Sequence, residues 1–333
     1  MKVVVAQNPV FSQYYSSGLY LNPALAGLEK DTYFGMNYRS QWSNVSLPFN
    51  TFQFSFIQPI TKPGARKKHW GGVGLSFLND VAGANKEFVT NGLALSFAYD
   101  LHLNRYGNNI ISLGVQGGAG QQRINYNALR WSSQYSSFTG YDESLPGEAG
   151  LTTDNLFHPV FNAGLMWYYT NKQRNLSHYS TALYNGVAVY NLVRSNGFYL
   201  NKKSDASLLY KVHGGLLSTW SRKVEISPNY LIQYQENTLQ INVGLYAGYA
   251  VVNNAPSSRS GNLNVNVGVW YRLKDAMIVS GGLSNSIWNI AFSYDANVFS
   301  LSKTFGYGSS YELSMGYKIL NRNGFRRFSS PLI

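Results

Sequence analysis

The chain has 333 residues, of which 44% are hydrophobic, so its composition excludes an intrinsically disordered protein. Only 13% of its residues are charged, about half the share in a typical soluble protein, which disfavours an ordinary soluble enzyme. The net charge of +12 comes with no nucleic-acid-binding module, and the lack of cysteine excludes disulfides and thiol catalysis. No apolar stretch approaches the roughly 18 residues of a transmembrane helix, so an all-β chain remains, either soluble or a membrane barrel.

Residues 1–6 look like the end of a signal peptide. Lys2 supplies a charge, residues 3–5 an apolar run, and Ala6 a small residue before Gln7. The run is shorter than a full signal-peptide core, so we expect a signal-peptide remnant or a trimmed start. The mature chain is then expected to begin near Gln7, outside the cytoplasm. An ordinary first strand is the alternative.

Residues 7–31 differ from the rest of the chain because they show little alternation. Pro9 and Pro23 hold the preceding residues in extended conformations, and Ala26-Gly27 can form a turn. We therefore expect a non-strand N-terminal segment. One hypothesis is that it packs under or inside a barrel and plugs the periplasmic mouth; an ordered arm without that role is the alternative.

From residue 32 to residue 319 the dominant hydrophobic period is two, which is the period of a β-strand. In residues 262–272, for example, an apolar face of Leu, Val and Tyr alternates with a face that carries Asn, Gly, Trp270 and Arg272. The runs are long enough for the roughly 9–11 residues that a tilted strand needs to cross a bilayer. We count about fourteen of them, beginning near Thr32, Phe49, His69, Lys86, Ile110, His158, His178, Ser207, Val224, Thr238, Gly261, Ala276, Ser286 and Ser309.

The two faces of these runs predict a membrane barrel rather than a soluble sandwich. One face is apolar with aromatic ends, and the other carries Gly, Ser, Asn and Gln where a soluble sheet would carry Lys and Glu. Strands in lipid must close on themselves, because an open edge leaves backbone groups unpaired. The sequence therefore predicts an all-β fold, a transmembrane outer-membrane β-barrel of about fourteen antiparallel strands over residues 32–319, with a periplasmic tail over residues 320–333. Trp270 and Tyr246 on the small and polar face favour a filled lumen.

If the first strand runs outward from the periplasm, each connection can be assigned to one side of the membrane. Residues 43–48, 79–85, 125–157, 193–206 and 297–308 then face the cell surface, and residues 61–68 and 252–260 face the periplasm. The longest connection, residues 125–157, carries aromatic side chains of the kind enriched at binding hot spots. We predict that a partner binds there, at Trp131, Tyr135, Phe138 and Tyr141.

Enzyme and metal chemistry have little support in the sequence. The acidic residues of the longest connection, Asp142, Glu143, Glu148 and Asp154, do not match the spacing of a calcium loop, so we expect a solvated loop and no metal. No two histidines have zinc-site spacing, and no GxSxG, P-loop or dinucleotide fingerprint occurs. Asp100 and His102 fall on the same face and with a serine could form a hydrolase triad, but we expect no enzyme and no cofactor.

Three stretches of the sequence carry a resemblance to a known family. Residues 8–15 read Asn-Pro-Val-Phe-Ser-Gln-Tyr-Tyr, residues 19–27 Leu-Tyr-Leu-Asn-Pro-Ala-Leu-Ala-Gly, and residues 38–42 Tyr-Arg-Ser-Gln-Trp. The pattern resembles the PorP/SprF family, and its motif falls on Asn8, Pro9, Phe11, Ser12, Gln13, Tyr14, Tyr15, Asn22, Pro23, Ala24, Gly27, Tyr38, Arg39, Gln41 and Trp42. Residues 16–18 depart from a more typical Asn-Pro turn, and the tail beyond residue 319 departs from barrels that end at their last strand.

The resemblance implies an outer-membrane component of the type IX secretion and gliding systems. Its surface loops would bind a secreted adhesin through a type B C-terminal domain and anchor it at the cell surface. Other secretion components and outer-membrane lipid are further implied partners, and nucleic acid is not. The alternative is a structural part of the secretion apparatus, held through residues 61–68 and the basic residues 322–327 on the periplasmic side. A solute porin is a third possibility.

Overall fold

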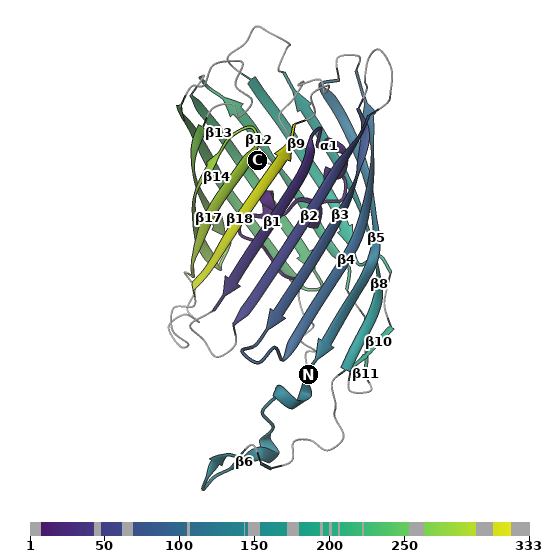
Figure 1. Cartoon of the computed structure of the whole chain (residues 1–333), viewed down its shortest axis with the longest axis vertical. Helices are drawn as coiled ribbons and strands as arrows, with labels where there is room; N and C mark the ends of the chain where they lie inside the picture. Colours follow the sequence, from purple (N-terminus) through teal and green to yellow (C-terminus); the bar gives the residue numbers. More distant parts are fainter. Residues whose placement is uncertain are drawn as a thin grey trace.

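The computed structural model describes residues 8–42, 48–61, 69–104, 107–142, 144–145, 154–171, 180–193, 196–199, 202–205, 207–221, 223–252, 263–297 and 309–320. The expected signal-peptide remnant, the basic residues 62–68 and the tail from residue 321 lie outside this part of the chain. Within it, fourteen strands form a closed antiparallel barrel (Figure 1). They are β1 (Thr32–Gln41), β2 (Phe49–Thr61), β3 (His69–Ala82), β4 (Phe88–His102), β5 (Asn109–Ile124), β8 (Asp154–Thr170), β9 (Ser180–Tyr190), β12 (Leu209–Thr219), β13 (Val224–Gln235), β14 (Thr238–Val252), β15 (Leu263–Arg272), β16 (Ala276–Ser284), β17 (Trp288–Asn297) and β18 (Ser309–Ile319).

Pairing between the first and last strands closes the barrel. Thr32 lies opposite Ile319, and Gln41 lies opposite Ser310. Closure leaves no strand edge facing lipid, where unpaired backbone groups would be costly. The strands span 9 to 17 residues and are strongly tilted in Figure 1, as membrane crossing requires. The predicted fold class and strand number are confirmed.

Alternating strand direction divides the connections between two rims. We call the end where β1 stops and β18 starts the long-loop rim, because residues 125–153 connect β5 to β8 there. The opposite end, where β1 starts at Thr32 and β18 stops at Ile319, is the terminal rim. The long-loop rim is at the bottom of Figure 1, where a small hairpin projects well beyond the barrel.

The outward side chains form an apolar belt. Leu95, Val115, Val243, Val267 and Phe292 each leave more than half of their surface uncovered. In water such a continuous apolar surface would favour aggregation, but in a bilayer it is the surface that lipid solvates. Burial alternates strictly along much of β15, so the period read in the sequence corresponds to outward and inward faces.

The packed core of the molecule lies inside the barrel. Its buried apolar residues come from two sources: Leu19, Leu25 and Leu28 precede β1, while Ile57 and Trp270 project inward from the strands. A barrel of fourteen strands is wider than the eight-stranded size that side chains of the wall can fill alone. The N-terminal segment supplies the missing volume.

The helical elements are short. The N-terminal segment contains η1 (Tyr14–Ser16), η2 (Gly18–Tyr20) and α1 (Leu25–Leu28). The long β5–β8 connection contains η3 (Tyr126–Ala128), η4 (Ser132–Gln134) and the hairpin strands β6 (Tyr135–Ser136) and β7 (Gly140–Tyr141), and the β9–β12 connection contains the pair β10 (Asn196–Tyr199) and β11 (Lys202–Asp205). In the described part of the chain, no helix is long and apolar enough to span a membrane.

Candidate functional site: the filled lumen and the protruding hairpin

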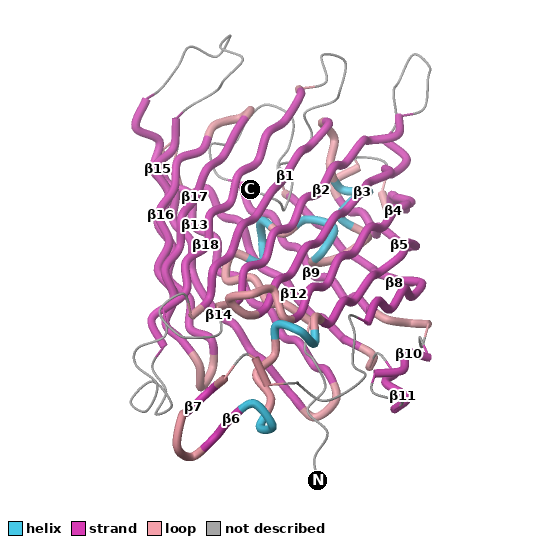
Figure 2. The backbone as a smooth tube through the Cα atoms, turned by 60° about the horizontal axis from the view of Figure 1, so that its bottom comes forward, coloured by secondary structure: helices cyan, strands magenta, loops and turns pink. Residues whose placement is uncertain are grey.

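The N-terminal segment, residues 8–31, runs through the lumen from one rim to the other. Near the long-loop rim, the backbone N–H of Asn8 donates a hydrogen bond of 3.2 Å to Gln235 Oε1 at the end of β13. Near the terminal rim, Glu29 lies 3.8 Å from Lys318 Nζ. Figure 2 shows the short helical turns of the segment enclosed by the strands. The segment thus lies inside the barrel, one of the two placements that the plug hypothesis gave, and whether it plugs the periplasmic mouth stays a prediction.

Four charged side chains meet Ser12 inside the barrel, close to the long-loop rim. Arg39 Nη2 lies 2.9 Å from Asp295 Oδ2, its Nη1 lies 3.4 Å from Glu312 Oε2, and Arg272 Nη2 lies 2.8 Å from the same Asp295 oxygen. Ser12 donates from Oγ to Asp295 at 2.6 Å and from its backbone N–H to Glu312 at 2.7 Å. All five side chains are buried, and the two cations and two anions compensate each other, as buried charges must. We call these residues the charged cluster.

The side chain of Gln13 fastens the same turn to the barrel wall. Its Nε2 donates to the carbonyl of Glu312 at 3.0 Å and to Ser293 Oγ at 3.2 Å, while its Oε1 accepts from Ser314 Oγ at 2.6 Å. A carboxamide that uses both ends in this way fixes position and orientation together. The motif residues Ser12 and Gln13 therefore attach the segment to β17 and β18.

An aromatic layer follows the charged cluster along the segment. Tyr15 stacks on Trp270 with ring centroids 5.2 Å apart and an interplanar angle of 22°. Trp270 Nε1 donates to Asn229 Oδ1 at 2.8 Å, and the hydroxyl of Tyr14 bonds to the same oxygen. Tyr246, buried beside Tyr15, completes the filled lumen that the inward positions of Trp270 and Tyr246 predict.

Beyond the aromatic layer, glycines of the wall admit the backbone of the segment. A Cβ on Gly72 would lie 2.0 Å from the carbonyl oxygen of Ala26, and one on Gly114 would lie 2.3 Å from the backbone N of Ala24. Such distances are far below van der Waals contact, so only glycine permits this approach. Conversely, a Cβ on the motif residue Gly27 would lie 2.2 Å from Ser112 Oγ.

Asn22 anchors the segment on the far wall. Its Nδ2 donates to the carbonyls of Leu165 at 3.2 Å and Val187 at 3.3 Å and lies 3.1 Å from His213 Nε2. Its Oδ1 accepts from the backbone N–H of Ala24 at 2.9 Å, which fixes the turn through Pro23. Motif residues on one side of the lumen thus bond to β17 and β18, and Asn22 bonds to β8 and β9.

The structure does not bring all motif residues into the lumen. Tyr38 and Trp42 are exposed on the outside of the barrel, and Trp42 packs edge-on against Phe49 with ring centroids 5.4 Å apart. Gln41 is half-buried at the end of β1. Arg39 faces inward, because alternate residues of a strand point to opposite faces. At the start of the segment, Phe11 and Pro9 contact Tyr20, through ring packing at 5.5 Å and a hydrogen bond of 2.6 Å from the Tyr20 hydroxyl to the Pro9 carbonyl.

The predicted partner-binding residues lie on a small ordered hairpin at the long-loop rim. Tyr135 pairs with Tyr141 across β6 and β7, and Phe138 at the tip is 98% exposed. Trp131 lies half-buried at the base, where its ring is 6.4 Å from that of Tyr126. Buried Gln134 braces the hairpin by donating from Nε2 to the carbonyl of Leu145 at 3.0 Å and accepting at Oε1 from the backbone of Trp131 at 3.1 Å.

Asp142 in this connection has a local role. It accepts hydrogen bonds from the backbone and hydroxyl of Ser144 at 2.9 and 2.6 Å, which lower the pKa of its exposed carboxyl. Glu143 and Glu148 lie outside the described residues, as does the side chain of Asp154. No group of three or more His, Asp or Glu residues able to hold a metal occurs in the part of the chain that the structure describes.

Asp100 and His102, which the sequence places on the same strand face, do not form a hydrogen bond with each other. Asp100 is buried and lies 2.9 Å from Nδ1 of His69 on the neighbouring strand. His102 is exposed at the end of β4, and its Nε2 lies 2.8 Å from the carbonyl oxygen of His69. The hydroxyl of Ser112 bonds to the carbonyl of Ala24, and His69 Nε2 has no hydrogen-bond partner in the described chain. These residues therefore lack the hydrogen bond from serine to histidine that a triad needs.

The sequence did not single out the charged side chains that Ser12 and Arg39 meet. Asp295, Glu312 and Arg272 are separated widely in the sequence, but each lies on the inward face of its strand. A signal was available: with only 15 acidic residues in the chain, two on otherwise small and polar faces of neighbouring strands are unusual.

The comparisons with known proteins concern family and fold. A family model described as "Type IX secretion system membrane protein PorP/SprF" matches residues 3–317. No curated protein matches the chain. Among solved structures, the chain is similar to the toluene transporter TodX of Pseudomonas putida, with 9% identity, coverage of 91% of this chain and 93% of the other, and a TM-score of 0.49. It is also similar to the toluene transporter TbuX of Ralstonia pickettii, with 11% identity, coverage of 91% and 93%, and a TM-score of 0.46. The beta domain of the Bordetella autotransporter Brka gives 10% identity, coverage of 87% and 100%, and a TM-score of 0.43.

Proposed function

The chain belongs to the PorP/SprF family of type IX secretion system membrane proteins, and from this premise we propose that it is a non-enzymatic outer-membrane anchor for a secreted adhesin. The adhesin would bind through its type B C-terminal domain to the loops of the long-loop rim. In this proposal the long-loop rim faces the cell surface, and the barrel holds the adhesin without transporting a solute.

The observation that carries the proposal is the hairpin of β6 and β7. It projects beyond the barrel (Figure 1), it is braced from within by Gln134, and it presents the uncovered rings of Phe138 and Tyr135. A large apolar ring held in water on an ordered element is the usual form of a protein-binding hot spot. Ordering before binding also reduces the entropy that association must overcome.

The segment inside the lumen also favours the anchor over a solute porin. A porin needs a water-filled passage, whereas here the N-terminal segment crosses the lumen and bonds to strands on opposite walls. The polar contacts are distributed along the segment rather than confined to one hinge. We therefore consider a solute porin less well supported than an anchor or an apparatus component.

A binding measurement with rim-specific variants tests the proposal. Purified protein in detergent would be titrated with the isolated C-terminal domain of a candidate adhesin. We expect Phe138→Ala combined with Tyr135→Ala to weaken binding by roughly tenfold or more, because truncation of a hot-spot aromatic costs at least about 2 kcal/mol.

Trp220→Ala is the matched control, since it removes an exposed aromatic side chain from the terminal rim. Unchanged affinity in this control together with weakened binding in the hairpin variant supports the anchor. If instead only Trp220→Ala reduces recovery of secretion components from solubilised membranes, the protein is a part of the apparatus bound through its other rim.

A further inference from the structure

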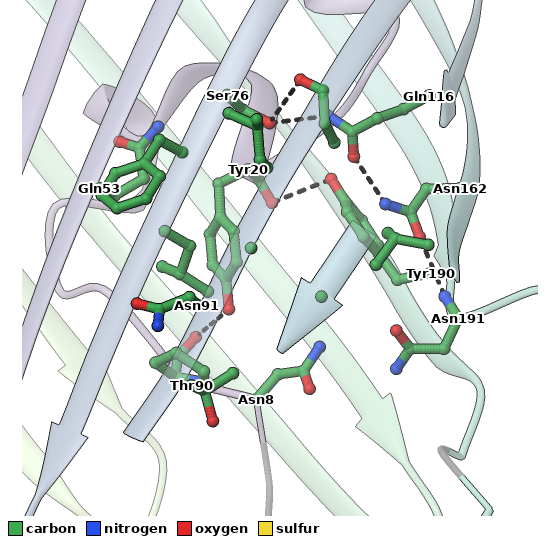
Figure 3. A pocket seen from close by; sticks show the side chains of 18 of the residues that line it. Asn8, Tyr20, Gln53, Ser76, Thr90, Asn91, Gln116, Asn162, Tyr190 and Asn191 are labelled. Atoms are coloured by element: carbon green, nitrogen blue, oxygen red, sulfur yellow. Dashed lines mark hydrogen bonds between the residues drawn. The ribbon is translucent and has the colours of Figure 1, made fainter. Parts of the chain in front are cut away.

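A cavity of about 130 Å³ lies between the N-terminal segment and the inner wall formed by β2–β5, β8 and β9 (Figure 3). Asn8, Pro9 and Tyr20 form the segment side, and Tyr190 stands on the wall. The cavity belongs to the half of the lumen near the long-loop rim, where Asn8 is bonded to Gln235. The charged cluster lies against β1, β15, β17 and β18, so the cavity is a separate site.

The chemistry of the lining is uncharged and rich in carboxamides. Among the residues that the structure describes, no Asp, Glu, Lys or Arg lines the cavity. The nearby ammonium of Lys211 is already engaged, because its Nζ donates to the carbonyl of Tyr20 at 2.6 Å. An ionic ligand would be desolvated there without a compensating charge. A carboxamide both donates and accepts, so the lining suits an uncharged ligand that does the same. The seven amide side chains are those of Asn8, Gln53, Asn91, Gln116, Gln122, Asn162 and Asn191.

Several of these amides are held in place before any ligand arrives. Asn162 Nδ2 donates to Gln116 Oε1 at 2.6 Å, and Gln116 Nε2 donates to Ser76 Oγ at 3.1 Å. Asn162 Oδ1 accepts from the backbone N–H of Asn191 at 3.0 Å, which gives the continuous chain of hydrogen bonds visible in Figure 3. Groups fixed in this way lose little freedom on binding.

Two buried polar atoms of the lining lack partners within the described chain. Gln53 is 1% exposed, and its Oε1 accepts no hydrogen bond while its Nε2 donates to Ser55 Oγ at 2.5 Å. Nδ1 of His158 is also buried without a partner. A buried polar atom in this state is destabilising unless a ligand or water bonds to it. Both side chains line the cavity but cover these atoms at present, so each must turn toward the cavity to meet a ligand. A ligand hydroxyl could then donate to Gln53 Oε1 and take either role with His158 Nδ1.

The two tyrosines supply apolar walls. The Tyr20 hydroxyl is engaged with the carbonyl of Pro9 at 2.6 Å, and the Tyr190 hydroxyl with the carbonyl of Tyr20 at 2.9 Å. Their rings stand 6.4 Å apart at 45°. Lys211 Nζ lies over both rings, 4.0 Å from the Tyr20 centroid and 4.4 Å from the Tyr190 centroid. Since the hydroxyls are already used, what the tyrosines offer a ligand is the ring surface that Lys211 leaves uncovered.

We propose that this cavity binds one uncharged sugar ring. A pyranose presents hydroxyl groups that donate and accept together with apolar C–H faces, which matches amides beside aromatic rings. An extended peptide fits less well, because it is bound through a free strand edge or an apolar groove, and the closed barrel leaves no edge. The proposal does not depend on adhesin anchoring.

The test uses the full chain in detergent and measures binding of D-glucose, D-galactose, D-mannose and N-acetyl-D-glucosamine by saturation-transfer difference NMR and calorimetry. At least one of these sugars is expected to bind, and Gln53→Met is expected to weaken its binding by roughly tenfold through loss of the buried acceptor. Asn266→Leu is the matched control, since Asn266 is a buried inward amide on β15 outside the cavity. Thr90→Trp, which fills the cavity from a lining position close to the long-loop rim, replaces Gln53→Met if that variant does not fold.

Each outcome decides the proposal. Binding that is lost in the cavity variants and kept in Asn266→Leu supports it. Failure of all four sugars to bind the folded protein overturns it and leaves water as the occupant, and binding that the cavity variants do not change places the sugar elsewhere. Methyl glycosides of the same sugars distinguish a free sugar from a sugar unit within a glycan chain. A site that binds them accepts a chain-linked unit, whereas a site that rejects them accepts only the free sugar.

Discussion

The hydroxyl of Ser12 donates a hydrogen bond of 2.6 Å to Oδ2 of Asp295, although 283 positions separate the two residues in the sequence. The same oxygen faces Arg39 and Arg272, so one carboxylate joins the N-terminal segment, the first strand and two strands near the end of the chain. The segment is therefore attached at the seam where the barrel closes. The charged cluster is therefore a structural joint in which two residues of the family motif, Ser12 and Arg39, meet side chains from the end of the chain.

Asp295→Asn is expected to destabilise the barrel by about 3–5 kcal/mol, because it leaves two buried arginines with too few negative partners. Unfolding in urea, followed by tryptophan fluorescence in detergent, measures the change. Asp275→Asn is the control, since Asp275 also pairs with Arg272 but its side chain is 55% exposed, and such pairs contribute less than about 1 kcal/mol. Equal effects of the two variants would contradict a special role for the buried joint.

Gly114→Val is expected to displace the N-terminal segment. The new Cβ would lie 2.3 Å from the backbone N of Ala24, and a backbone neighbour cannot turn away as a flexible side chain can. The expected cost is about 1–3 kcal/mol of stability, with faster cleavage of residues 8–31 by added protease. Gly281→Val should change neither, because a Cβ at Gly281 meets nothing within 4 Å.

The barrel could be predicted from the sequence because its signal is local. Alternation along residues 262–272, for example, shows which face is apolar without knowledge of any partner. The same pattern elsewhere predicted strand starts that coincide with those of β1, β2 and β3. The contents of the lumen have no such period. Nothing in residues 8–31 indicates that Asn22 reaches β8 and β9 while Ser12 reaches β17, since these contacts depend on the closed shape. The partner of Asp100 could not be read from the sequence for the same reason: His69 is a neighbour across strands and not along one.

Deletion of residues 8–27 is expected to open the barrel. The segment fills space that a fourteen-stranded wall cannot fill by itself, so its loss should raise the single-channel conductance in a planar lipid bilayer. Ser12→Ala, which keeps the segment but removes one of its bonds, should leave the conductance near that of the intact chain. If the deletion variant inserts as a folded barrel and its leak does not rise, the segment is an arm and not a plug.

The orientation of the two rims can be measured directly, because the chain contains no cysteine and each introduced thiol is the only one present. Phe138→Cys places a thiol at the tip of the hairpin on the long-loop rim, and Trp220→Cys places one at an exposed position of the terminal rim. In bacterial outer-membrane barrels the longer loops face outward, so a membrane-impermeant maleimide added to intact cells should label the first variant and spare the second until the outer membrane is permeabilised. The reverse labelling pattern would show that the hairpin faces the periplasm. An adhesin at the cell surface could not then reach Phe138, and the aromatic hairpin would become a contact for the secretion apparatus instead.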